Sequence, residues 1–101
     1  ELVLAGEFID AERAYAVGLT TRVVPKDELM DAARSLAAKL KAKAPQALGV
    51  AKQLINTCMS MDATSARVLE RMAQSTLVLT EDHKEGIRAF REKRKPVYTG
   101  R

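Results

Sequence analysis

Side chains suited to binding an anion gather at the C-terminal end of this sequence. From Lys84 to Arg101 there are seven Lys or Arg and two acidic residues, a balance of +5. The first 83 residues carry ten basic and eleven acidic side chains, so the whole net charge of +4 comes from this last segment. A compact cluster of cations suits a phosphate-bearing small ligand. A solvated basic end without a ligand is the alternative interpretation.

Other reactive side chains are few. Aromatic residues make up only 4% of the sequence, too few for the stacking surfaces of single-strand binders, so we expect no nucleic-acid partner. The single cysteine, Cys58, excludes an internal disulfide and has apolar or neutral neighbours, so we expect a small core residue. His83 is the only histidine, and we expect no catalysis from it and no metal site.

The basic segment is predicted to follow a capped helix. Thr80 is a good N-cap, and Glu81 and Asp82 place negative charge at the positive end of the helix dipole. The basic run Lys93–Lys95 suits the other end, and Pro96 stops the helix.

Shorter elements are predicted nearer the N-terminus. Asp10 is expected to cap a helix over 11–17, ended by Gly18 in a left-handed conformation. The β-branched segment Leu19–Val24, before Pro25, predicts one short strand or extended segment.

Three helices are predicted in the middle, which makes the fold class mainly α. Pro45 begins the second of them, and the polar stretch Asn56–Asp62 precedes the third. Apolar residues at helical spacing define one face of each: Leu29, Ala33, Leu36 and Leu40; then Ala47, Ala51, Leu54, Ile55 and Cys58; then Leu69, Met72, Ala73, Thr76 and Leu79.

The length of 101 residues predicts one thin domain with a modest core that leans on another domain or another copy. No apolar run is long enough to cross a membrane, so we expect no membrane partner. The chain starts without Met, inside an apolar run, with no signal peptide. We therefore interpret it as a piece of a longer protein.

Two strings resemble one family. The run Glu85-Gly86-x-x-Ala89-Phe90-x-Glu92-Lys93-Arg94 closely resembles the C-terminal signature of the enoyl-CoA hydratase/isomerase (crotonase) family. The resemblance covers nearly the whole chain and is weakest in Ser60–Leu79. The segment 1–29 is also similar, through Glu1, Leu2, Leu4 and Gly6, Ile9, Ala11 and Ala14, Gly18 and Leu19, Val23 to Pro25, and Asp27 to Leu29.

The resemblance implies that residues 1–101 form the helical C-terminal self-association domain of the crotonase fold. This domain would build a trimer, or a dimer of trimers, and one wall of the coenzyme A pocket. The two carboxylates and two backbone N–H groups that hydration needs would lie in an N-terminal spiral domain absent from this chain. No catalytic residue is therefore assigned here, and the chain alone is expected to be inactive.

Two binding residues follow from the same resemblance. Phe90 and Lys93 match the aromatic and the Lys that lie against the adenine and phosphates of coenzyme A. Their spacing of three predicts one shared helix face. A core anchor and a solvated charge are the respective alternatives. Arg94 and Lys95 are weaker candidates beside them.

The implied activity is hydration of 2-enoyl-CoA thioesters in fatty-acid oxidation. The ligand would be an acyl-CoA, with no cofactor beyond the coenzyme A of the substrate. The compartment would be the bacterial cytoplasm or the mitochondrial matrix. Isomerase, dehydratase or acyl-CoA hydrolase chemistry is the alternative within the family. A standalone helical self-association module without catalysis is the alternative outside it.

Overall fold

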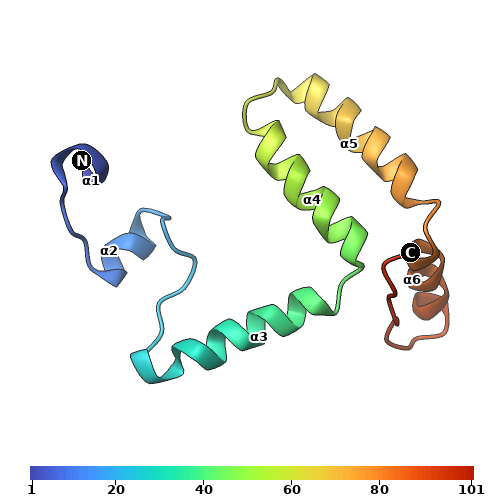
Figure 1. Cartoon of the computed structure of the whole chain (residues 1–101), viewed down its shortest axis with the longest axis horizontal. Helices are drawn as coiled ribbons and strands as arrows, with labels where there is room; N and C mark the ends of the chain where they lie inside the picture. The colour runs from blue at the N-terminus through green and yellow to red at the C-terminus, as the bar shows by residue number, and fades with distance from the viewer. The chain divides into compact units, whose positions relative to one another are not determined.

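The computed structural model describes all 101 residues. It contains six α-helices and one short 3-10 helix, joined by turns and loops, and no strand (Figure 1). The predicted mainly α class is therefore confirmed. The chain divides into two units, Glu1–Ser35 and Leu36–Arg101, which are described separately.

The first unit begins with two short helices that end at left-handed glycines. Helix α1 (Leu2–Ala5) stops at Gly6, with φ of 68°. Helix α2 (Ala11–Ala16) starts at Asp10, whose carboxylate accepts a 2.7 Å hydrogen bond from the Arg13 amide. Gly18 follows α2 with φ of 77°, and only glycine adopts this conformation without cost. The predicted cap and stop are thus confirmed.

The segment Leu19–Val24 forms no strand, so of the two predicted alternatives only a non-helical, unpaired segment remains. A strand needs a neighbour for its backbone groups, and this chain supplies none. The 3-10 turn η1 (Lys26–Glu28) then leads into helix α3 (Leu29–Lys41), which begins in the first unit and ends in the second.

Helices α4 (Pro45–Cys58) and α5 (Ala63–Leu77) pack against each other in the second unit (Figure 1). Pro45 occupies the first turn of α4, as predicted, because the missing N–H is not needed there. The Asp62 carboxylate caps α5 by accepting hydrogen bonds from the Thr64 and Ser65 amides at 2.9 and 3.0 Å. These bonds, chiefly those from Ser65, lower the pKa of Asp62.

The apolar faces predicted for α4 and α5 are broader than the faces that pack. Ile55, Met72 and Leu79 were expected on the buried side, but all three are exposed. Two helices in contact cover only a narrow strip of each other, so neighbouring apolar positions stay open. Cys58 is half-buried in this strip. The half-buried positions of the pair are Ala47, Val50, Leu54, Cys58, Ala66, Leu69, Ala73 and Leu77.

Helix α6 (Glu81–Arg91) ends four residues earlier than the run to Pro96 suggested. Its Thr80 cap is confirmed: the hydroxyl accepts a hydrogen bond from the His83 amide at 3.1 Å and donates one to the Leu77 carbonyl at 2.7 Å. Ala89 on α6 is the one buried apolar residue of the chain, at 1% exposure. None of the helices combines the length and apolar character that a membrane crossing requires.

Candidate functional site

Two buried carboxylates on α6 fold the C-terminal tail back along the helix. Asp82 is 3% exposed, and its oxygens accept hydrogen bonds from the amides of Thr99 at 2.7 Å and Gly100 at 2.9 Å. The Asp82 amide donates to the Arg101 carbonyl at 2.9 Å. Asp82 therefore binds the last three residues of the chain. This role is additional to its predicted interaction with the helix dipole.

Glu85 lies one turn further along α6 and is 7% exposed. Arg94 donates to both of its oxygens, at 2.5 and 3.0 Å, and Arg88 donates to one of them at 2.6 and 3.0 Å. The Val97 amide adds a bond of 3.0 Å. The hydrogen bonds from Arg94, Val97 and Arg88, in that order, hold the pKa of Glu85 far below its ordinary value. The hydrogen bonds to Glu85 and then Glu92 raise the pKa of Arg94.

These contacts argue against Arg94 as a phosphate-binding residue. Arg94 was a possible phosphate ligand, but its guanidinium is already bound to Glu85 and, at 2.6 Å, to Glu92. Bidentate pairing of this kind uses the donors that a phosphate would need. Arg94 is therefore a tail anchor. Asp82 and Glu85 likewise accept hydrogen bonds from the tail, which leaves them poorly suited to general acid or base chemistry.

The predicted shared helix face of Phe90 and Lys93 is wrong. Lys93 lies beyond the end of α6 and has φ of 54°, the chain's one non-glycine residue with positive φ. The Arg94 amide donates to the Ala89 carbonyl at 3.0 Å, and the Lys93 amide donates to the Phe90 carbonyl at 3.2 Å. This is a Schellman motif with Lys93 at the position that glycine usually occupies. The turn, not helical periodicity, sets the direction of the Lys93 side chain.

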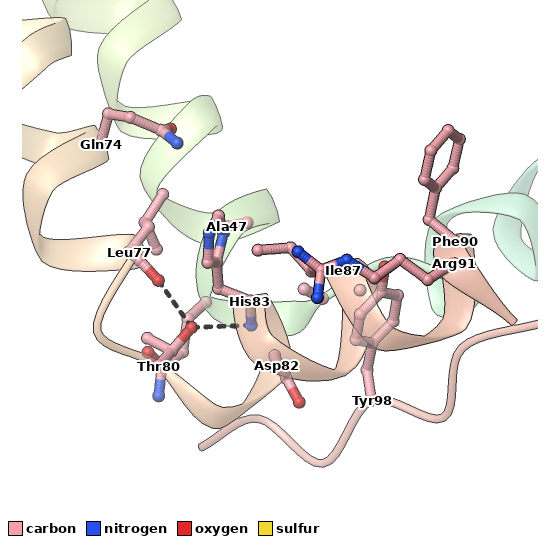
Figure 2. A pocket seen from close by; sticks show the side chains of 13 residues that line it. Ala47, Gln74, Leu77, Thr80, Asp82, His83, Ile87, Phe90, Arg91 and Tyr98 are labelled. Carbon is pink, nitrogen blue, oxygen red and sulfur yellow. Dashed lines mark hydrogen bonds between the residues drawn. The ribbon is translucent and has the colours of Figure 1, made fainter.

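Phe90 stands at an open hollow of about 560 Å³ within the second unit (Figure 2). Phe90 is 85% exposed and its ring extends away from α6, so it anchors no core within this chain. Lys93 does not line this hollow and forms no ion pair. The lining comes from α4, α5, α6 and the tail: Ala44, Gln46, Ala47, Gln74, Leu77, Thr80, Asp82, His83, Gly86, Ile87, Phe90, Arg91 and Tyr98.

Several of these positions were not predicted as site residues. Tyr98 packs against Gly86, since a β-carbon built there would lie 3.4 Å from the Tyr98 hydroxyl oxygen. Arg91 extends along α6 towards His83 (Figure 2). A spacing of four between His83 and Ile87, then three to Phe90, marks the helix face toward the hollow. Nothing in the sequence near Tyr98 shows that the tail returns to α6.

The chemistry that this hollow offers is binding. Its walls combine apolar surface with scattered polar groups, a composition typical of ligand pockets. No group of three or more His, Cys, Asp or Glu residues is arranged to hold a metal ion.

Comparison with known proteins assigns the family. The family described as enoyl-CoA hydratase/isomerase matches residues 1–101. The chain therefore belongs to the enoyl-CoA hydratase/isomerase family, as its two terminal motifs suggested.

Among curated proteins, the 2,3-dehydroadipyl-CoA hydratase of Escherichia coli K12 is 38% identical over 101 residues, which are 100% of this chain and 40% of that protein. The short-chain-enoyl-CoA hydratase of Clostridium acetobutylicum is 38% identical over 95 residues, covering 94% of this chain and 36% of that protein. The chain thus spans about two fifths of the length of these relatives.

Solved structures agree on the fold. An enoyl-CoA hydratase from Geobacillus kaustophilus matches with a TM-score of 0.89 and 36% identity, over 97% of this chain and 37% of that one. A short-chain enoyl-CoA hydratase structure from Novosphingobium aromaticivorans matches with a TM-score of 0.86 and 40% identity, over 99% of this chain and 40% of that one. The helical fold is therefore a piece of the crotonase fold.

Proposed function

We propose that this chain is the C-terminal part of an enoyl-CoA hydratase, with Phe90 and Lys93 on the wall that receives the nucleotide end of an acyl-CoA. The observation that carries the proposal is the exposure of Phe90 at the open hollow. Lys93 lies in the turn that follows α6, and its ammonium group forms no ion pair. An open aromatic ring stacks on a purine, and a free ammonium binds phosphate.

Among the reactions of this family, hydration is the one that we propose for the full-length protein. Relatives named as hydratases act on dehydroadipyl-CoA, short-chain enoyl-CoA and methylglutaconyl-CoA. The proposed substrate is accordingly a 2-enoyl-CoA of fatty-acid oxidation, and no cofactor is needed beyond its coenzyme A. The setting would be the bacterial cytoplasm or, as for mitochondrial relatives, the mitochondrial matrix.

The test compares Phe90→Ala and Lys93→Ala in the full-length protein. Both groups would touch the nucleotide, far from the reacting carbons, so KM should rise while kcat holds. Loss of the Lys93 contact should cost about 1 kcal/mol and depend on salt. Lys84→Ala is the matched control, because Lys84 is an exposed α6 lysine already paired with Glu81 at 2.7 Å.

A truncated substrate separates binding from structural damage. A pantetheine thioester lacks the nucleotide, so the variants and the wild type should turn it over equally. Equal impairment of the variants on both substrates would show that Phe90 and Lys93 are structural.

Self-association is the second proposed function of this chain. Large apolar side chains are exposed on both units, including Phe8, Met59 and Leu79. Such surfaces mark interfaces, with the rest of the protein or with other copies. A trimer, or a dimer of trimers, is the proposed assembly of the full-length protein, and sedimentation of that protein tests it.

Catalysis is proposed to need residues outside these 101. The isolated chain should therefore give no turnover of crotonyl-CoA above the buffer rate. Activity that survives repurification would contradict this and would place the reaction centre within these helices.

A further inference from the structure

A second hollow, of about 400 Å³, lies between the end of α3, the start of α4 and the tail. Three of its lining residues are lysines, Lys41, Lys43 and Lys95, and none of them takes part in an ion pair. We call it the lysine hollow. Its remaining lining is Ala42, Pro45, Pro96 and Tyr98.

The lysine hollow has no acidic residue in the segments that build it. The sequence contains no Asp or Glu from Ala32 to Met61, and none after Glu92. The two buried carboxylates of the neighbouring helix, Asp82 and Glu85, are occupied by the tail amides and by Arg94. Three like charges around one concave surface raise the local positive potential, which attracts an anion.

Fixed contacts hold the tail lysine at this place. Lys95 lies between two anchored residues, because Arg94 pairs with Glu85 and the Val97 amide donates to the same carboxylate. Gln46 on α4 donates a 2.7 Å hydrogen bond to the Gly100 carbonyl, which ties the tail to the start of α4. The two sides of the hollow, distant in sequence, are thereby joined.

The start of α4 adds to the positive potential. No side chain caps this helix at Ala44, and Pro45 in its first turn lines the hollow. The first amides of a helix carry partial positive charge, which favours anions.

We propose that the lysine hollow binds a phosphate-bearing small molecule through a diphosphate group. Lysine ammonium groups bind phosphate as point charges from several directions, whereas planar pairing with a carboxylate favours arginine. Neither Phe90 nor Lys93 lines this hollow, so its lysines can be tested separately from the nucleotide wall proposed above.

The experiment titrates inorganic pyrophosphate into the full-length protein by calorimetry at low and moderate salt. Wild type should bind saturably, and binding should weaken as salt rises. Lys43→Ala and Lys95→Ala should each raise the dissociation constant roughly fivefold, and the double variant more. Lys52→Ala, which removes an exposed α4 lysine outside the hollow, and Phe90→Ala should match wild type.

A repeat with saturating coenzyme A distinguishes the two sources of the diphosphate. Unchanged pyrophosphate binding supports a separate phosphorylated ligand, and competition supports the diphosphate of coenzyme A as the occupant. Absence of binding in wild type, or equal weakening in Lys52→Ala, would overturn the proposal. Because Phe90→Ala affects only the nucleotide wall, its acyl-CoA kinetics fail or succeed separately from this test.

Discussion

Glu85 and Arg94, nine residues apart, form a bidentate ion pair that closes the C-terminal tail onto α6. The guanidinium donates to both carboxylate oxygens, at 2.5 and 3.0 Å, and the carboxyl group is almost fully buried. Asp82, one turn earlier, receives the amides of Thr99 and Gly100. The basic tail is thus ordered, because two carboxylates of the preceding helix bind it at two separate points.

The two anchors predict separate effects on hydrogen exchange of the tail amides. Glu85→Ala removes the acceptor of the Val97 amide, so that amide should exchange at least about tenfold faster in the full-length protein. Thr99 and Gly100 should stay better protected, because Asp82 still accepts their hydrogen bonds. Asp82→Ala should give the reverse pattern, and Glu81→Ala, at an exposed pair, should change neither. A uniform change across the tail would contradict two independent anchors.

The pKa of Glu85 predicts when its anchor fails. Its folded-state pKa lies far below the ordinary value of 4.5, so its stabilising contribution is fully present above that value. The contribution is lost as the pH falls from 4.5 towards the folded-state pKa. Val97 protection, corrected for intrinsic exchange, should therefore be constant from about pH 8 to about pH 5.5 and decline only in stronger acid. Glu85→Gln should lack the part of the decline that comes from this group.

Helix starts and stops that depend on residues close in sequence could be predicted from the sequence. Asp10, Pro45 and Thr80 each act through neighbours within four residues, so their predicted positions at helix starts are confirmed. Gly18 ends α2 for the same reason, since only its own backbone conformation is involved.

Contacts between residues far apart in the sequence could not be predicted from it. Arg94 was a possible ligand because nothing in a basic run reveals that one member pairs with a helix carboxylate. The partner of Asp82 lies 17 residues away, and only the folded tail brings them together. The stop at Lys93 was missed because lysine does not favour positive φ, so the residue type gives no signal of a left-handed turn.

Exposed apolar faces predict that the 101-residue chain alone associates. Val68 and Met72 share one exposed side of α5, and Leu79, in the turn after that helix, is also exposed. Sedimentation at increasing concentration should show growing mass, and Met72→Glu should weaken the association. Arg71→Glu is the matched control, because it changes charge at a neighbouring exposed polar position. A strictly monomeric, well-folded species at high concentration would argue against an interface on these faces.

Lys93 allows its backbone and its ammonium group to be tested apart. In the left-handed conformation a non-glycine residue costs roughly 1 kcal/mol, so Lys93→Gly should stabilise the full-length protein by about that amount. The same substitution removes the ammonium, so acyl-CoA binding should weaken as much as in Lys93→Ala. Lys93→Ala lacks the stability gain because alanine keeps the β-carbon that opposes positive φ. Thermal unfolding measures the first effect and KM for acyl-CoA the second. A stabilised Lys93→Gly protein with unchanged KM would assign Lys93 to the turn alone and remove it from the nucleotide wall.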